Sequence, residues 1–456
     1  MSGTDRDGRT GPGGTARAVL RQLRDHQSPR LALLYGMNGA GALEAGGEGA
    51  RVELSDGRTA LDFGSYAVTL LGRRHPAVLR AVGGELDAMA VSTRVLANAT
   101  TVRFAAQLAA YTDPGRLTKV WLGLNGCDAV EAALKLARLA TGRGRVIAVE
   151  GAYHGKSLGA LAATWHPRYR GSLEPLLGGV THVPPDPAAV PGAFADGDVA
   201  AVIVEPVQGE GGVRPLEPAF LGALATEARR HGAFLIADEI QTGLRRCGER
   251  ALSTALGLAP DAVLFGKALG GGVQPLSALV ATEELYAPLA DDPFVHSTTF
   301  SGHPLGAAAG SAALRAVEDL APRGRRLAAL LADGLDRVRH RHPDLVTAVR
   351  GRGLLWGVEF GPAGAGGDVL LELSRRGLVV SPCLGQPRVI RLLPPLVATD
   401  EQVEEALDIL DATCAAVPGE FRSGARNASA GDRNGAIGSP REATPPPVTA
   451  SLADRG

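Results

Sequence analysis

The chain has 456 residues, a formal net charge of −1 and a hydrophobic fraction of 45%. This length and composition suit an enzyme of two or three folded domains, and the balanced charge argues against nucleic acid or an anionic membrane surface as a partner. No run of about 18 apolar residues predicts a membrane-spanning helix. The polar residues 1–14 lack the apolar core of a signal peptide, so we expect a cytoplasmic protein.

Lysine is the rarest of the basic residues. Of 47 lysines and arginines, only four are lysines: Lys119, Lys135, Lys156 and Lys267. Codon bias explains the excess of arginine, because alanine, glycine and proline are abundant too. If the chemistry needs an amine as nucleophile, however, only four side chains can supply it.

Cysteine is equally sparse. The four cysteines are far apart and form no Cys-x-x-Cys pair: Cys127, Cys247, Cys383 and Cys414. The sequence therefore predicts neither a disulfide framework nor a metal site, and it fits a reducing cytoplasm.

Short apolar runs alternate with helical patterns through the first two thirds of the chain. The predicted buried strands cover residues 119–122, 145–149, 199–204, 233–237, 262–265 and 277–281. The clearest helical stretches between them cover residues 128–140 and 218–231. Such alternation predicts an α/β fold with a largely parallel sheet that is covered on both faces.

A second region begins near residue 320. It contains a predicted helix at 324–340, strands at 354–359, 378–381 and 389–393, and a closing helix at 400–415. We interpret it as a smaller α+β domain. Residues 1–15 and 419–456 contain few large apolar residues and are predicted to be disordered.

Lys267 is the most informative of the four lysines. It follows the predicted strand 262–265 and precedes the glycines of residues 270–272. Partial desolvation at such a strand end would lower the pKa of the amine toward neutrality, which suits a Schiff-base lysine. The alternative is an ordinary surface-loop lysine. A phosphate-binding P-loop is excluded, because its first glycine and its Ser/Thr are missing.

Asp238 ends the predicted strand 233–237. Ligands bind at the carboxyl ends of strands in α/β folds, and a buried carboxylate there needs a cationic partner. The ring nitrogen of pyridoxal phosphate is such a partner. The alternative is a helix N-cap, for which aspartate is common.

Two further motifs follow strands. Asn-Gly-Cys-Asp at residues 125–128 opens a helix whose first backbone N–H groups would bind a phosphate, although a simply capped helix looks similar. Ala-Tyr-His-Gly at residues 152–155 provides an aromatic ring that would stack on a planar cofactor or belong to the core.

Taken in order, these motifs resemble the class III aminotransferases. The matching series also includes Glu-Pro-Val-Gln-Gly-Glu at 205–210, Asp-Glu-Ile-Gln-Thr-Gly at 238–243 and Ser-Thr-Thr-Phe at 297–300. The similarity extends over residues 52–397. This family comprises enzymes of fold type I that depend on pyridoxal 5′-phosphate, such as ornithine, acetylornithine and 4-aminobutyrate aminotransferases.

The resemblance implies a fold and its division. The fold would have a large domain with a mostly parallel seven-stranded sheet and a smaller α+β domain. The large cofactor-binding domain would cover residues 71–318 and the small domain residues 319–418. Residues 16–70 would form an N-terminal segment that joins the small domain.

The resemblance also implies roles around the cofactor. Lys267 would form the Schiff base and move a proton, Asp238 would pair with the pyridinium nitrogen, and Gln241 would bind the 3-oxygen. The other implied cofactor contacts are phosphate binding by Gly126 and Cys127, stacking by Tyr153, and positions near the cofactor for His154 and Glu205. Thr299 would reach the phosphate in the other subunit, which implies a homodimer with shared active sites.

On the substrate side, Glu210 would act as a gate that pairs with Arg391. Arg391 would bind the carboxylate of a 2-oxoacid in one half-reaction and be masked by Glu210 in the other. Lys156 stands where relatives that bind a carboxylate often carry arginine, and Tyr66 places an aromatic ring near the presumed substrate entrance.

We therefore expect an aminotransferase that uses a small-molecule amino donor and a carbonyl acceptor. Glu210 and Arg391 favour glutamate and 2-oxoglutarate as one pair. Lys156 and Tyr66 favour an ω-amine, aldehyde or ketone as the other substrate, and the composition suggests a role in natural-product biosynthesis. The alternatives are an aminomutase, decarboxylase or racemase of the same fold, or a non-catalytic binding protein.

Overall fold

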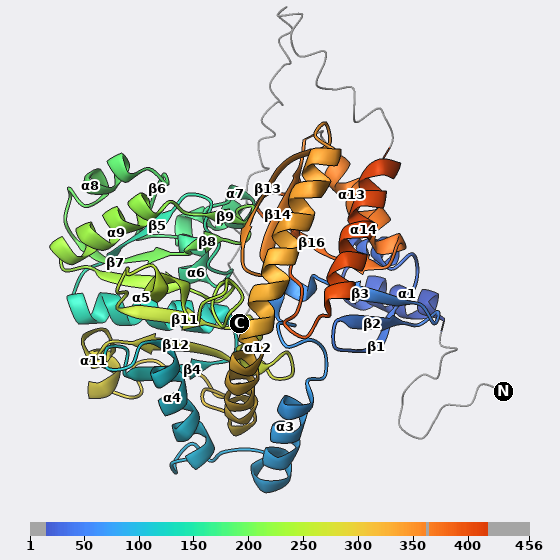
Figure 1. Cartoon of the computed structure of the whole chain (residues 1–456). Helices are drawn as coiled ribbons and strands as arrows, with labels where there is room; N and C mark the ends of the chain where they lie inside the picture. The colour runs from blue at the N-terminus through green and yellow to red at the C-terminus, as the bar shows by residue number, and fades with distance from the viewer. Residues whose placement is uncertain (1–14, 362–363, 418–456) are drawn as a thin grey trace, which may run out of the picture.

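The computed structural model describes residues 15–361 and 364–417. Apart from Thr15, the two predicted disordered segments, residues 1–15 and 419–456, lie outside the described residues. Figure 1 shows the large sheet with its helices on one side of the long helix α12 (Pro304–Arg341) and the small sheet with β1, β2 and β3 on the other. No helix in the described part of the chain is both long and apolar enough to cross a membrane.

The large sheet has seven strands in the order β4-β12-β11-β10-β7-β5-β6. Their bounds are β4 (Lys119–Gly123), β5 (Arg145–Val149), β6 (Val180–Val183), β7 (Val199–Val204), β10 (Phe234–Asp238), β11 (Ala262–Phe265) and β12 (Ser277–Ala281). All neighbours pair in parallel except β12, which is antiparallel to β11 and β4. The mostly parallel α/β sheet is therefore confirmed, and six of its strands were predicted to within one residue.

The sheet is buried on both faces, and the alternation along its strands shows how. In β7, Ala201 and Ile203 pack with α5 (Gly126–Thr141), whereas Val202 and Val204 pack with α9 (Pro218–Arg230). Because successive strand residues point to opposite faces, continuous apolar strands of this kind need a helix on each side.

The remaining helices and short strands connect these layers. They are α1 (Ala16–His26), α2 (Pro29–Asn38), α3 (Pro76–Met89), α4 (Ala99–Thr112), α6 (Leu158–Ala163), α7 (Pro167–Arg170), α8 (Val190–Ala193), α10 (Leu252–Ala255), α11 (Glu283–Asp291), β8 (Val207–Gln208) and β9 (Arg214–Pro215). The 3₁₀ turns are η1 (Ser65–Ala67), η2 (Gly171–Leu176), η3 (Pro187–Ala189) and η4 (Lys267–Gly270).

Two four-stranded sheets and the two-stranded sheet β8-β9 complete the described fold. One has the order β13-β14-β17-β16, with bounds β13 (Val346–Arg352), β14 (Leu355–Phe360), β17 (Val389–Leu392) and β16 (Ser381–Pro382). The other joins β1 (Glu44–Glu48), β2 (Arg51–Leu54) and β3 (Thr59–Asp62) to β15 (Leu378–Val379). Helix α13 (Ala365–Arg375) packs against strands of both sheets, and α14 (Asp400–Ala416) packs against α12 and α13. The stretch predicted as one strand at 378–381 thus divides between two sheets.

The predicted helix at 324–340 is only the second half of α12 (Pro304–Arg341). The first half contains Gly306 and Gly310, and glycine is unfavourable in a helix interior. In the structure they provide space, because a Cβ on Gly310 would lie 2.5 Å from the Phe104 ring. Helix α12 crosses the proposed boundary between residues 318 and 319, and the domain division stays a prediction.

Candidate active site

The predicted functional residues gather where neighbouring parallel strands end. Asp238 is the last residue of β10, Glu205 follows β7, and Lys267 opens η4 directly beyond β11. Tyr153 and His154 lie on the loop after β5. The carboxyl edge of the sheet therefore brings these groups together, as expected for an α/β fold.

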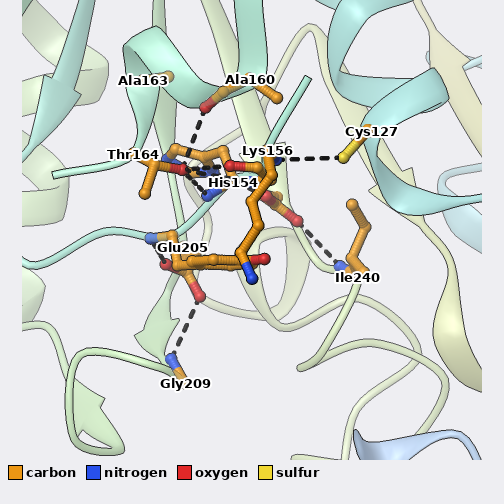
Figure 2. A network of polar contacts seen from close by, with 12 residues as sticks. Cys127, His154, Lys156, Ala160, Ala163, Thr164, Glu205, Gly209 and Ile240 are labelled. Atoms are coloured by element: carbon orange, nitrogen blue, oxygen red, sulfur yellow. Dashed lines mark hydrogen bonds and ion pairs between the residues drawn. The ribbon is translucent and has the colours of Figure 1, made fainter. Parts of the chain in front are cut away.

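Asp238 is held by a histidine. The Asp238 Oδ2 lies 2.7 Å from the His154 Nδ1, and its Oδ1 accepts from the Ile240 N–H at 3.1 Å. Burial lowers the pKa of His154, but the hydrogen bond and the negative charge of Asp238 outweigh it, so the pKa lies above its ordinary value. The Thr164 hydroxyl accepts from the His154 N–H at 3.0 Å and fixes the backbone (Figure 2).

Glu205 holds the loop that carries Tyr153. Its two oxygens accept from the backbone N–H groups of Tyr153, at 2.8 Å, and Gly209, at 3.1 Å (Figure 2 shows the bond to Gly209). Burial raises the pKa of Glu205, His154 lowers it and Asp238 raises it, and the net result is a pKa of about 7. The carboxyl group therefore keeps its proton more readily than an exposed glutamate does, while it fixes the loop.

Lys267 is constrained and desolvated. Its φ of 43° is in the left-handed region, which a non-glycine residue enters at a cost. Burial lowers the pKa of its amine, Glu210 and Asp238 oppose that effect, and Arg391 adds to it. A larger share of the amine is therefore neutral, and so nucleophilic, at physiological pH than for an exposed lysine.

Glu210 and Arg391 form a buried ion pair. The Arg391 Nη1 contacts the Glu210 Oε1, and the two side chains are 0% and 6% exposed. The other oxygen of Glu210 accepts from the Leu384 N–H at 2.8 Å, and Gln241 Oε1 lies 3.5 Å from Arg391 Nη1. The pair joins two separate sheets, since Arg391 lies on β17 and Glu210 follows β8.

The start of α5 provides an anion cradle beside these groups. Asn125 caps the helix and forms a capping box with Asp128, so the N–H groups of Gly126 and Cys127 point outward without helical partners. A Cβ on Gly126 would lie 3.0 Å from Ile240, so the helix start lies close to the loop after Asp238.

This donor set fits pyridoxal phosphate. It combines a desolvated amine at Lys267, a carboxylate at Asp238 suited to a protonated ring nitrogen, and helix N–H groups suited to a phosphate.

A cavity of about 340 Å³ opens next to the ion pair. Its lining includes Tyr153, His166, Tyr169, Glu210 and Gln386. The Lys156 Nζ lies 5.0 Å from the centre of the Tyr169 ring, and the Lys156 N–H donates to the Cys127 Sγ at 3.4 Å. Among the described residues, no carboxylate pairs with the Lys156 amine.

Two predicted residues lie at the margin. Tyr66 is 62% exposed on η1, whose residues Ser65 to Ala67 all have positive φ, and η1 packs against η4. Thr299 is exposed, and its carbonyl accepts from Arg94 at 2.9 Å. No hydrogen bond or ion pair between the described residues links Thr299 to the other predicted site residues.

Sequence reasoning missed three residues of this site. Thr164 fixes the His154 backbone, Leu384 binds Glu210, and the Tyr169 hydroxyl donates to the Leu384 carbonyl at 2.9 Å. No spacing rule indicates a leucine that acts through its backbone. A tyrosine between arginines in a four-residue helix looks like a surface residue in sequence.

Comparison with known proteins decides the family. The family model described as aminotransferase class-III matches residues 42–414, which is more than half of the chain. The chain belongs to the class III aminotransferases. It is therefore a pyridoxal-phosphate-dependent aminotransferase, which acts on an amino donor and a carbonyl acceptor.

Solved structures of other aminotransferases agree. The ornithine aminotransferase of Toxoplasma gondii is 31% identical, with a TM-score of 0.81 over 90% of this chain and 96% of that one. An amine transaminase from an uncultivated Pseudomonas species is 28% identical, with a TM-score of 0.76 over 82% and 94%. An (S)-enantioselective ω-transaminase from Thermomicrobium roseum is 26% identical, with a TM-score of 0.79 over 88% and 98%.

Proposed function

We propose that this aminotransferase moves an amino group between the glutamate/2-oxoglutarate pair and an ω-amine, aldehyde or ketone. The observation that carries the proposal is the buried pair of Glu210 and Arg391 beside Gln241. An arginine guanidinium binds carboxylates in a bidentate manner, and a glutamate that masks it lets the same site accept a substrate without a carboxylate.

The cofactor supplies an electron sink that stabilises negative charge on the substrate carbon. We assign its phosphate to the N–H groups of Gly126 and Cys127, its ring to Tyr153, and its 3-oxygen to Gln241. Asp238, which is oriented by His154, would keep the ring nitrogen protonated. Glu205 would act indirectly, because it fixes the backbone of Tyr153.

Lys267 carries the proton in this proposal. Its amine would hold the cofactor covalently and, once freed by a substrate amine, would move the proton between the substrate carbon and the C4′ carbon of the cofactor. Burial lowers the pKa of Lys267, which keeps the amine able to accept that proton at neutral pH.

The second substrate would enter past Tyr66 and Lys156. A lysine is a point charge and lacks the bidentate geometry of the arginine that often stands at the Lys156 position in relatives. The Lys156 amine lies over the Tyr169 ring and has no carboxylate partner among the described residues, which supports recognition of a group other than an α-carboxylate. A role in natural-product biosynthesis and a cytoplasmic location stay predictions.

We also propose a homodimer. Large apolar side chains are exposed on two neighbouring segments, with Val95 at 89% and Phe294 at 84%. The segments touch, because Arg94 donates to the carbonyls of Thr298 and Thr299. An apolar surface of this kind typically marks a protein interface, and it would place Thr299 toward the partner.

The test is a half-reaction. The holoenzyme mixed with glutamate alone should lose the absorbance of the lysine-bound cofactor and release one equivalent of 2-oxoglutarate. Arg391→Lys should slow this step, whereas Arg388→Lys, an exposed arginine three residues earlier, should not. Unchanged absorbance with glutamate, together with turnover of an ω-amine and pyruvate, would contradict glutamate as donor.

A further inference from the structure

The Glu210 carboxylate is held in its masking position from two sides. One oxygen contacts Arg391, and the other accepts from the Leu384 N–H at 2.8 Å. The Gly385 N–H also donates to the Glu210 carbonyl at 3.0 Å. The backbone of residues 384 and 385 is therefore a second anchor for the gate, in addition to the arginine, which also binds the Ser381 hydroxyl and the Pro382 carbonyl of the same segment.

This anchor is itself fixed by a side chain. The Tyr169 hydroxyl donates to the Leu384 carbonyl at 2.9 Å. The Tyr169 ring packs edge-to-face against the Tyr153 ring, with centroids 5.9 Å apart. The Lys156 amine lies over the face of the Tyr169 ring. A continuous chain of contacts thus runs from the loop at Tyr153 through Tyr169 and Leu384 to Glu210.

A cavity beside Glu210 offers space for a second position of its side chain. Glu210 and Tyr169 both line the 340 Å³ cavity, together with Gly385 and Gln386. A carboxylate released from Arg391 can therefore turn into this space, where polar atoms and solvent are available. The balance between the masking and the released position depends on how firmly Leu384 is held.

We propose that Tyr169 is a positioning residue that sets the masking position of Glu210 through Leu384 and so tunes the preference between dicarboxylates and substrates without a carboxylate. The inference rests on the proposed gating function of Glu210 and Arg391. Loss of the hydroxyl frees the Leu384 peptide, weakens its bond to Glu210 and makes Arg391 more available to a carboxylate.

The test measures binding rather than turnover. Glutarate is a dicarboxylate without a reactive carbonyl, and its affinity for the holoenzyme can be measured by isothermal titration calorimetry. Tyr169→Phe should tighten glutarate binding about three- to tenfold, the range expected when one neutral hydrogen bond no longer holds the closed position. Glu210→Gln should tighten it as well, and Tyr169→Phe should add nothing in the Glu210→Gln background.

A matched control is available in Tyr286→Phe. The Tyr286 hydroxyl donates to the Val120 carbonyl at 3.3 Å, which is the same type of bond away from the site, and its removal should leave glutarate affinity unchanged. If Glu210→Gln tightens binding but Tyr169→Phe does not, the positioning role of Tyr169 is wrong and the gate stands. If Glu210→Gln itself has no effect, the gate is wrong, and the inference fails with it.

Discussion

Gly155 offers a sharp test of the contact between the Tyr153 loop and the start of α5. Its φ of 136° is unfavourable for a side chain, and an added Cβ would overlap the Cys127 Sγ and lie 3.0 Å from the Ala160 Cβ. Gly155→Ala should therefore combine backbone strain of about 1–3 kcal/mol with overpacking of about 1–3 kcal/mol. The expected loss in the free energy of unfolding is about 2–6 kcal/mol.

The two contributions can be separated with a double-mutant cycle. In a Cys127→Ala background the sulfur is gone, so Gly155→Ala should cost about 1–3 kcal/mol less than in the wild type. Urea unfolding of the apoprotein at pH 7 measures each value. Gly142→Ala is the control, because Gly142 caps the other end of α5 with a φ of 67° and open space around its Cβ. A coupling below about 0.5 kcal/mol between Gly155 and Cys127 would refute the steric argument.

Three further predictions concern chemistry and pH. Lys267→Arg should abolish covalent cofactor attachment and slow transamination at least about a hundredfold, while Lys135→Arg on α5 leaves both unchanged. The absorbance spectrum of the holoenzyme measures the attachment, and the rate of transamination measures the activity. Asp238→Asn should reduce the transamination rate about ten- to hundredfold through loss of a charge-assisted hydrogen bond. A decrease of less than twofold would contradict the role of Asp238 as the partner of the ring nitrogen. Burial raises the pKa of Glu318, but Arg245 and Arg250 outweigh it and lower the pKa to about 2, against an ordinary value of 4.5. The contribution of the Glu318 carboxylate to the free energy of unfolding is therefore complete above pH 4.5 and is lost as the pH falls toward 2. At neutral pH, Glu318→Gln should lower the free energy of unfolding by about 1 kcal/mol, a small value because the ion pairs are partly solvated. In urea melts, this difference between wild type and variant should narrow as the pH falls from 4.5 to 2.

The sequence predicted the large sheet well because its strands are buried on both faces. Strands such as Val199–Val204 are continuous apolar runs with sharp ends. Strand β6 (Val180–Val183) was missed, because it is short and contains Thr181 and His182. The first half of α12 was missed because Gly306 and Gly310 serve packing against Leu276 and Phe104.

At the site, sequence motifs located residues but not their partners. The motif containing Asp238 indicates a carboxylate at a strand end, yet nothing in the chain order shows that His154, 84 residues earlier, holds it at 2.7 Å. Contacts made by a backbone, such as that of Leu384 with Glu210, leave no sequence signal at all. Individual side-chain roles toward the cofactor remain predictions, since they concern contacts with a bound molecule.

Helix α12 has a thermodynamic consequence for the whole molecule. It is 38 residues long, or about 57 Å, and it packs against η4 beside Lys267 as well as against β13 and α14. One continuous apolar core accompanies it, from Phe265 and Leu269 to Val346 and Leu396. We therefore expect the region that follows α12 and carries Arg391 to have little stability of its own. Both parts should melt in one cooperative transition, and limited proteolysis should not release either as a folded fragment.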